Sequence, residues 1–278
     1  MNDAPLDIGV LGLGIIGSRV ADQLRAADHR VHAWSATGRA GGLSRPREVA
    51  EAAKVVQIFV RDSVALLEAV RDMAPALTPE HLVLNHATVS KEAVLEAAQL
   101  CAAAGADFLD APFTGSKLAA QNAKLVYYVG GDEALLERAR PVLKLSSVKI
   151  LHLGSVGDAM VLKIVTNLIT AVTVKALAEA AAITRAEGVS LTALQTALES
   201  NANHSALLGM KLPAFIQNDF EPHFALVNML KDADFARELA GGAGLRTPAL
   251  ECTAEAMRAA AEAGFGDLDF SVIGRMES

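Results

Sequence analysis

Residues 8–17 read IGVLGLGIIG, and this stretch decides how the first part of the chain is built. Residues 8–11 predict a buried strand, and residues 15–27 have the composition and spacing of a helix. Between them the glycines follow a G-x-G-x-x-G pattern. The first allows a tight turn, the second lets a pyrophosphate approach the backbone, and the third lets the helix pack on the strand. We therefore assign to a dinucleotide cofactor the motif residues Gly12, Leu13, Gly14, Ile15, Ile16 and Gly17.

Working outward, short β-branched runs alternate with helical stretches through the first half of the chain. Further strands are predicted at residues 31–34, 55–60, 82–84, 108–109, 125–129 and 148–151. Helices are predicted between them at residues 63–73, 91–103 and 133–143. This alternation is typical of βαβ units, in which a parallel sheet is covered by helices on both faces. Val60, at the end of one predicted strand, joins the cofactor assignment.

The pattern changes after Gly157. Residues 158–187 contain no proline or glycine and are apolar on nearly every side, which predicts a long helix buried between other elements. More helices are predicted at residues 191–199, 225–240 and 248–263. The expected fold is therefore an α/β Rossmann-like domain at residues 1–157, followed by an all-α domain at residues 158–278 that begins with a long interdomain helix.

Composition excludes several classes of function. The 278 residues carry a formal net charge of −7, so no broad basic surface is expected for nucleic acid or an anionic membrane. No uninterrupted apolar stretch suggests a membrane span, and the start of the chain has no secretory pattern. Cys101 and Cys252 match no metal or redox spacing, so we expect two reduced, buried thiols, no metal site and a cytoplasmic location.

The type of cofactor depends on the residues after the second predicted strand. NAD-specific sites usually place an acidic residue there to bind the ribose 2′-hydroxyl. Residues 30–47 read RVHAWSATGRAGGLSRPR and contain no acid. Ser35 and Thr37 can donate to a 2′-phosphate and Arg39 can pair with it, which favours NADPH. The alternative is that these arginines are solvated loop charges.

Lys163 and Asn167 lie four residues apart, on one face of the long predicted helix. A lysine in an otherwise apolar helix is costly unless its charge is needed. Its ammonium can protonate a carbonyl oxygen as hydride reaches the carbon, with Asn167 holding the lysine or the oxygen. The alternative is a lysine that extends to the helix surface.

Four stretches together resemble the β-hydroxyacid dehydrogenase family, which includes 3-hydroxyisobutyrate and 6-phosphogluconate dehydrogenases. They are IGVLGLGIIG at residues 8–17, DAPFTGSKLAAQNAKLVYYVGGD at 110–132, GSVGDAMVLKIVTN at 154–167 and FALVNMLKD at 224–232. The similarity runs nearly from end to end. Within the family, TGSK at residues 114–117 and GFGDLDFSVI at 264–273 look like the glyoxylate and succinic semialdehyde reductases.

The resemblance implies a role for each matching residue. Lys163 would be the catalytic acid and Asn167 its helper, while Thr88 would lie near the nicotinamide. The substrate carboxylate would be bound by Thr114, Gly115 and Ser116. From the helical domain would come Phe224 and Asp232 for the substrate and Lys231 for the cofactor. The resemblance also implies a homodimer or homotetramer formed through the helical domain.

We therefore expect NADPH-dependent reduction of a small carboxylated aldehyde to the hydroxy acid. Among the departures from the family pattern, Thr114 replaces a usual serine, and Ala36 stands where NADPH-using relatives often have arginine. The main alternative is a 3-hydroxy acid dehydrogenase of the 3-hydroxyisobutyrate or tartronate semialdehyde type, which needs the same residues. A 6-phosphogluconate dehydrogenase is disfavoured by the small helical domain, and an imine reductase by Lys163. A different class of protein is a catalytically idle NADPH-binding sensor. Such a sensor would be expected to have lost Lys163, Asn167 or the substrate loop, and all of these are present.

Overall fold

The computed structural model describes residues 4–38 and 42–276, so the prediction for Arg39 lies outside the described residues. The chain divides into two compact units, residues 1–163 and residues 164–278. The two units divide inside the helix Asp158–Ala186, and the predicted domain boundary at residue 157 lies just before that helix.

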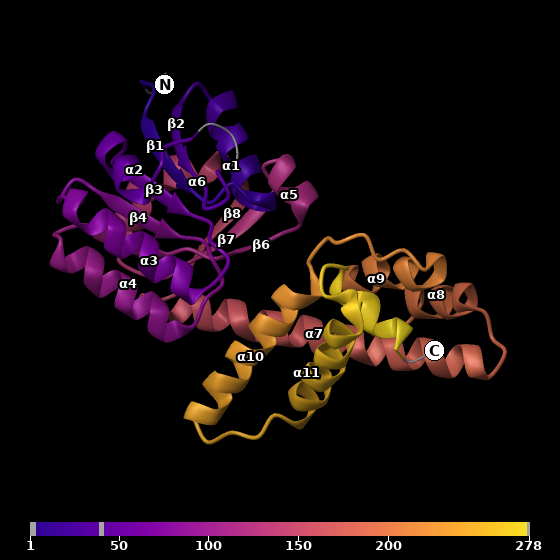
Figure 1. Cartoon of the computed structure of the whole chain (residues 1–278). Coiled ribbons are helices and arrows are strands. Elements are labelled where there is room, and N and C mark those ends of the chain that lie inside the picture. The colour runs from indigo at the N-terminus through magenta and orange to yellow at the C-terminus, as the bar shows by residue number, and fades with distance from the viewer. Residues whose placement is uncertain (1–3, 39–41, 277–278) are drawn as a thin grey trace. The chain divides into compact units, whose positions relative to one another are not determined.

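A five-stranded parallel sheet forms the centre of the first unit (Figure 1). Its strands are β1 (Asp7–Leu11), β2 (Arg30–Trp34), β3 (Val55–Ile58), β4 (Leu82–Asn85) and β5 (Asp107–Asp110). Their order across the sheet is β2-β1-β3-β4-β5. β2 and β3 therefore lie on opposite sides of β1, and the strand order reverses there, as in doubly wound nucleotide-binding folds. The predicted Rossmann-like sheet is confirmed.

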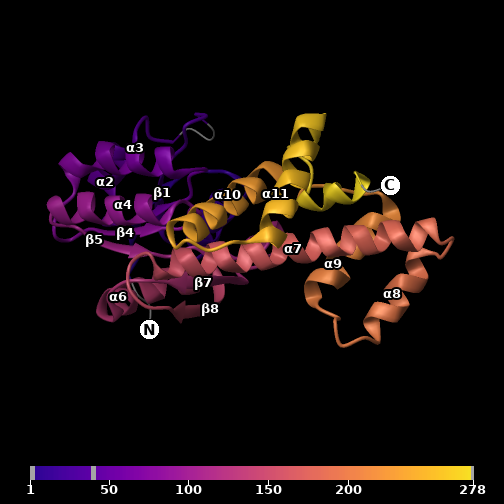
Figure 2. The ribbon, with the colours of Figure 1, turned by 90° about the horizontal axis from the view of Figure 1, so that it is seen from below.

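Helices cover both faces of this sheet (Figures 1 and 2). α1 (Ile15–Ala26) and α6 (Glu133–Lys144) share one buried apolar cluster with the sheet, while α2 (Pro46–Ala52), α3 (Ser63–Met73) and α4 (Lys91–Ala103) lie on the other face. A short 3₁₀ helix, η1 (Ala74–Ala76), follows α3. Asp62, Ser90 and Asp132 cap three of these helices through side-chain oxygens, which satisfies backbone N–H groups of the first turn.

A second, three-stranded sheet continues the first unit. β6 (Phe113–Thr114) is antiparallel to β7 (Leu125–Val129), which is parallel to β8 (Ser147–His152). Backbone hydrogen bonds between Asp110 and Gly130 join the two sheets. The short helix α5 (Lys117–Gln121) follows β6. Neither β6 nor α5 was predicted, because two and five residues are too few to show a periodic pattern.

The second unit is helical. The long helix α7 (Asp158–Ala186) is followed by α8 (Leu191–Glu199), α9 (Ala206–Gln217), α10 (Leu226–Gly242) and α11 (Pro248–Ala260). The chain then makes a π-helical turn, η2 (Ala261–Phe265), and a 3₁₀ helix, η3 (Phe270–Arg275). The helical C-terminal region agrees with the prediction. Helix α9 was missed because Pro213 interrupts its pattern.

Helix α7 is not buried all round, contrary to the sequence prediction. Its small and branched residues Ala171, Val174 and Ala178 lie in the core of the helical unit. Ile169 and Ile183, however, are 58% and 65% exposed. By length and composition α7 is also apolar enough to cross a membrane, although 39% of its most apolar window is buried inside the protein. One packed face is enough to hold a helix in a domain, so an apolar opposite face need not be covered within one chain.

The two cysteines are both free thiols. Cys101 is buried in α4, as expected, and burial raises the pKa of its thiol to about 12. Cys252 is exposed on α11, so the prediction that both are buried is wrong. The described residues contain no group of three or more His, Cys, Asp or Glu side chains arranged to hold a metal ion.

Candidate active site

The three glycines of the first turn have three different environments. Gly12 has a φ of +93°, and a Cβ placed there would lie 2.2 Å from the backbone oxygen of Phe59. A Cβ on Gly17 would lie 2.0 Å from the backbone oxygen of Gly12. A Cβ on Gly14, by contrast, would meet nothing within 4 Å. The first and third glycines are therefore required by packing within the protein, while the second borders open space where a ligand can approach the backbone.

The start of α1 faces this open space. Gly14 is its N-cap residue, and no described side chain caps the helix. The first N–H groups of a helix have no partner inside it, so they can bind an anion such as a pyrophosphate. Leu13 and Ile16 pack against the apolar cluster of the sheet, whereas Ile15 is 54% exposed. Leu13 and Ile16 can therefore reach a cofactor chiefly through their backbone.

The predicted cofactor residues follow strands that end in one row. The ladder pairs Leu11 with both Trp34 and Ile58, Ile58 with Asn85, and Asn85 with Asp110. The segments that follow these strands hold Gly12, Ser35, Val60 and Thr88, which therefore lie along the carboxyl edge of the sheet. In open α/β sheets this edge is where ligands bind.

The loop after β2 carries the residues predicted to select the cofactor. Ser35 and Thr37 are close enough to bond to one another, with 3.1 Å between their hydroxyl oxygens. Thr37 is exposed and Ser35 is half-buried. The structure thus brings two of the three predicted 2′-phosphate residues together.

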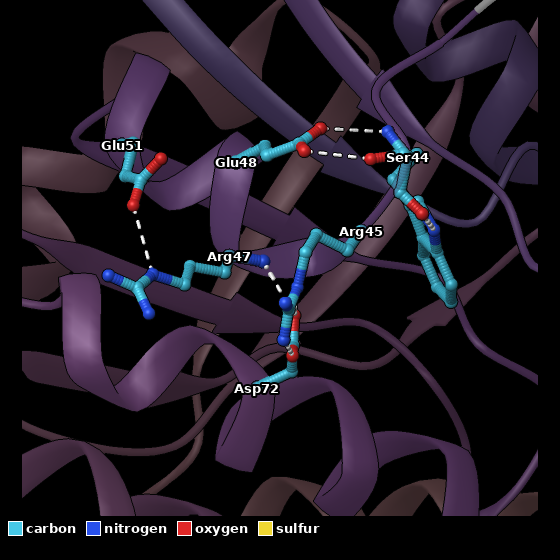
Figure 3. Close-up of polar contacts among 7 residues, drawn as sticks. Ser44, Arg45, Arg47, Glu48, Glu51 and Asp72 are labelled. Atoms are coloured by element: carbon cyan, nitrogen blue, oxygen red, sulfur yellow. Dashed lines mark hydrogen bonds and ion pairs between the residues drawn. The ribbon is translucent and has the colours of Figure 1, made fainter.

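The other arginines near this loop are held by carboxylates. Arg30 binds Asp7 through two nitrogen–oxygen contacts of 2.7 and 2.5 Å. Arg45 pairs with Asp72, and Arg47 Nε lies 2.9 Å from Glu51 Oε1 (Figure 3). In the same network Ser44 donates to Glu48, and Trp34 Nε1 donates to the backbone oxygen of Ser44 at 3.1 Å. The described carboxylates thus already pair with the side chains of these three arginines.

An aromatic cluster of Phe59, His86 and Tyr127, which involves the residues directly after β3 and β4, was not predicted. The rings of Phe59 and His86 stack with centroids 4.6 Å apart, and His86 lies 4.9 Å from the ring of Tyr127. Burial lowers the pKa of His86 to about 4, so the ring is neutral at physiological pH. Its Nδ1 lies 2.6 Å from the backbone oxygen of Ala111 and donates to it. His86 supports the edge of the sheet from behind, and an isolated histidine gave no sequence signal for that role.

The predicted substrate loop begins in β6. Gly115 has a φ of +135°, and a Cβ there would lie 2.9 Å from Leu125 Cδ2. Ser116 Oγ accepts from the backbone N–H of Ala119 at 3.4 Å and caps α5. Accepting this bond leaves the hydroxyl proton of Ser116 as a donor, and Thr114 offers a second hydroxyl one residue before Gly115. The loop can thus present hydroxyl donors to a carboxylate.

Asp110 anchors the start of α7, and sequence reasoning missed it. Its Oδ2 accepts from the backbone N–H of Met160 at 2.8 Å. Burial raises the pKa of Asp110 to about 7, against the lowering effect of hydrogen bonds from Met160, Gly157 and Asn85. Met160 lies three residues before Lys163, so this contact fixes the turn of α7 from which Lys163 projects. Its place at the head of the DAPFTGS motif was the available signal.

Replacing Asp110 with asparagine is expected to remove a pH dependence of stability. Because its folded-state pKa is raised, the folded protein holds a proton that the unfolded chain has lost between about pH 4 and pH 7. The free energy of unfolding of the wild type should therefore fall as the pH rises through this range, by up to about 4 kcal/mol from this group. Urea denaturation at pH 5 and pH 8 should show a smaller fall for Asp110→Asn. An identical fall in the free energy of unfolding in both proteins would contradict a raised pKa of Asp110.

Three of the predicted residues meet in the helical unit. Asn167 Nδ2 donates to Asp232 Oδ2 at 2.6 Å, and Lys231 Nζ lies 3.0 Å from Asp232 Oδ1. Asp232 is almost fully buried, so its charge is compensated by Lys231 and its second oxygen orients the amide of Asn167. Lys163 lies one turn before Asn167 on α7 and is half-buried. Phe224 precedes α10, and its ring meets that of Phe270 at 73° with centroids 6.3 Å apart.

The predicted residues therefore form two groups. In the first unit the cofactor turn, the edge residues and the substrate loop lie at or after the carboxyl ends of strands, and Lys163 lies on α7. In the second unit the buried Asn167 and Asp232 and the half-buried Lys231 form one cluster, and Phe224 lies just before α10, the helix that carries Lys231 and Asp232. A glycine turn of this geometry at the switch point of a parallel sheet defines a dinucleotide-binding domain.

Comparison with known proteins identifies the family. Residues 7–154 match the family model of the NAD binding domain of 6-phosphogluconate dehydrogenase, and residues 157–276 match that of the NAD-binding region of NADP-dependent 3-hydroxyisobutyrate dehydrogenase. The chain belongs to the β-hydroxyacid dehydrogenase family. It is accordingly an NAD(P)-dependent oxidoreductase acting on hydroxyl or aldehyde groups.

Several relatives match along nearly their whole length. Glyoxylate/succinic semialdehyde reductase 1 of Arabidopsis thaliana is 27% identical, covering 96% of this chain and 97% of its own. A probable 3-hydroxyisobutyrate dehydrogenase of Mycobacterium tuberculosis is 31% identical, covering 96% of each. The solved structure of M. tuberculosis 3-hydroxyisobutyrate dehydrogenase with L-serine has a TM-score of 0.89 and 28% identity, covering 98% of this chain and 99% of that one.

Proposed function

We propose that this enzyme reduces a small carboxylated aldehyde, glyoxylate or succinic semialdehyde, to the corresponding hydroxy acid with NADPH. The observation that carries the proposal is the loop Thr114–Gly115–Ser116. It offers two hydroxyl groups around a glycine with a positive φ, a conformation that residues with a side chain rarely adopt. Its sequence resembles the reductase branch of the family, and a glyoxylate/succinic semialdehyde reductase matches over nearly the whole chain.

Each residue has a defined task in this reaction. When bound, the reduced nicotinamide supplies a hydride to the aldehyde carbon. Thr114 and Ser116 hold the substrate carboxylate, and this contact contributes by orientation. Lys163 donates a proton to the aldehyde oxygen as negative charge develops on it. Asn167, oriented by Asp232, keeps the oxygen or the lysine in place.

A preference for NADPH over NADH is also part of the proposal. The 2′-phosphate would be bound by Ser35, Thr37 and Arg39. Support comes from the acid-free loop after β2 and from the proximity of the Ser35 and Thr37 hydroxyls. Since Arg30, Arg45 and Arg47 are already paired with carboxylates, Arg39 is the arginine of this stretch that we assign to the phosphate.

A substrate panel tests the function directly. Purified enzyme would be assayed with glyoxylate, succinic semialdehyde and tartronate semialdehyde, each with NADPH and with NADH, by absorbance at the nicotinamide band. We expect the highest kcat/KM for one of the first two aldehydes with NADPH. Absence of NADPH oxidation with every carboxylated aldehyde would refute the proposal, as would a clear preference for NADH.

The second candidate is a 3-hydroxy acid dehydrogenase working in the oxidative direction. It is favoured by the 31% identity to the probable 3-hydroxyisobutyrate dehydrogenase and by the TM-score of 0.89 to a solved enzyme of that name. Assays with 3-hydroxyisobutyrate and NAD or NADP distinguish the two. If the chain were an idle NADPH sensor, it would bind the cofactor tightly and turn over none of these compounds.

We further propose that the enzyme is a homodimer or homotetramer formed through its helical domain, residues 158–278, and that it works in the cytoplasm. Val165, Ile169 and Ile183 are 40–65% exposed along α7, which leaves an apolar face uncovered by one chain. Apolar faces of this kind commonly mark interfaces between subunits. Light scattering after size-exclusion chromatography should give a mass at least twice the 29.0 kDa of one chain. A monomeric mass at micromolar concentration would rule this assembly out.

A further inference from the structure

A single buried carboxylate, that of Asp269, collects donors from three separate segments of the helical unit. Its Oδ1 accepts from Lys211 Nζ at 2.6 Å, from Ser271 Oγ at 2.6 Å and from the backbone N–H of Ser271 at 3.1 Å. Its Oδ2 accepts from the backbone N–H groups of His223 at 3.1 Å and Phe224 at 3.2 Å. A carboxylate has about four lone-pair sites, so its accepting capacity is used in full.

Neither capping nor charge compensation explains this arrangement completely. Asp269 is the N-cap of η3, but capping requires only the bond from Ser271. Lys211 compensates the charge, and the two side chains are 5% and 3% exposed. Burial alone would raise the pKa of Asp269, but Lys211 and Ser271 hold it below its ordinary value, so the group is ionised at neutral pH. The bonds to His223 and Phe224 remain, and these belong to the segment before α10.

The residues before α10 and at its start form backbone hydrogen bonds with residues near the C-terminus. Besides the contacts of Asp269, Phe270 N–H donates to the backbone oxygen of Phe224 at 3.0 Å. Leu226 N–H donates to Leu268 O at 2.8 Å, and Val227 N–H donates to Gly266 O at 3.1 Å. Leu226 and Val227 begin α10, which no described side chain caps. Carbonyl groups of residues 266–268 therefore satisfy N–H groups that the helix itself leaves unpaired.

We propose that Asp269 is a positioning residue, which sets the place of Phe224 and of the first turns of α10 for substrate binding. This inference rests on the proposed function. Asp269 would align three residues of the proposed site: Phe224 directly, and Lys231 and Asp232 through the start of α10. Lys211 compensates the charge of Asp269, but it touches neither His223 nor Phe224 in the described contacts.

Two substitutions separate positioning from simple stabilisation. In Asp269→Asn we expect the side-chain amide oxygen to face Lys211 and Ser271, because the opposite orientation would place the amide NH₂ group against the ammonium of Lys211. The NH₂ group then faces the N–H groups of His223 and Phe224, which lose their acceptor. In Lys211→Met the carboxylate stays and keeps its bonds to both. The first substitution releases the segment, whereas the second removes only the charge partner.

The two variants are expected to differ in substrate binding. Asp269→Asn should raise the KM for the aldehyde about tenfold, as expected from loss of one to two hydrogen bonds, with the Kd for NADPH within about twofold of wild type. Lys211→Met should unfold at a lower temperature than wild type but keep its KM within about twofold. Equal effects of both variants on KM, or an unchanged KM in folded Asp269→Asn, would overturn the proposal.

Hydrogen exchange gives a readout that does not depend on the reaction. In Asp269→Asn, a peptide covering residues 220–227 should exchange about tenfold faster than in Lys211→Met, relative to a core peptide of α11 in each protein. If wild type reduces none of the aldehydes, the proposed function fails while this comparison still tests the role of Asp269. If Asp269→Asn does not fold, Asp269→Glu keeps the charge but displaces the oxygens, and the same faster exchange is expected. Wild-type exchange in both variants would contradict the proposal.

Discussion

A Lys163→Met variant is expected to lose about a hundredfold to ten-thousandfold in kcat, the range over which a positioned general acid contributes. Methionine retains most of the length of lysine and suits an apolar helix, so the fold should be preserved. The variant should bind NADPH with a Kd close to that of wild type, because the cofactor turn lies on β1 and α1 rather than on α7. Turnover with the best aldehyde and NADPH binding by fluorescence would be measured on the same preparation.

Lys175 provides the matched control on the same helix. It lies twelve residues further along α7, is almost fully buried, and pairs with Glu179 at 2.9 Å. We assign it no part in the reaction, so folded Lys175→Met should retain wild-type kcat. If Lys163→Met keeps full turnover, or if both variants lose activity equally, Lys163 is not the proton donor.

The second large effect is expected from alanine at two glycines of the same turn. Gly14→Ala should fold as well as wild type, because its φ of −71° suits any residue and no atom lies within 4 Å of the new Cβ. The methyl group would instead occupy the space assigned to the pyrophosphate. Binding of NADPH should weaken about tenfold to a hundredfold, as for an overpacked contact of about 1–3 kcal/mol.

Gly17→Ala should show the opposite result. Its Cβ would lie 2.0 Å from the backbone oxygen of Gly12, so the turn and the helix must separate. We expect the free energy of unfolding to fall by about 3 kcal/mol or more. Urea denaturation and NADPH titration of both variants check the pair. Undiminished NADPH binding by Gly14→Ala would mean that the cofactor does not approach this part of the turn.

Long periodic elements were predictable because their patterns are local. The strands at β1 to β5 and helices such as α3, α4 and α8 follow from spacing of apolar residues and from turn residues between them. The glycine motif predicted the first turn, because its spacing between a strand and a helix can be recognised locally, although the atom that excludes a side chain at Gly12 belongs to the distant Phe59. Short elements such as β6 and α5 carry no such period, and they exist because neighbouring segments hold them.

Part of the candidate site was also predictable, though its residue roles stay predictions. Lys163 was named because a lysine in an apolar helix is costly unless its charge is needed, whereas the Thr114 loop and the residues on α10 were named through the resemblance to the family. Asp110, His86 and Asp269 were missed. None of them belongs to a local pattern that marks a role, and what makes each informative is burial among partners up to 58 residues away in sequence.

By itself the sequence determined the main strands and the longer periodic helices, the cofactor turn and the presence of a lysine in the long apolar helix. These features can be recognised from patterns over a few neighbouring residues. Tertiary structure alone decided which carboxylate receives which donors. Asp232 accepts a hydrogen bond from Asn167, Asp110 from the start of α7, and Asp269 from Phe224. Because a buried carboxyl oxygen has no access to water, it accepts hydrogen bonds from the donors that pack against it. Local pattern cannot specify such partners, since they come together only when distant segments pack.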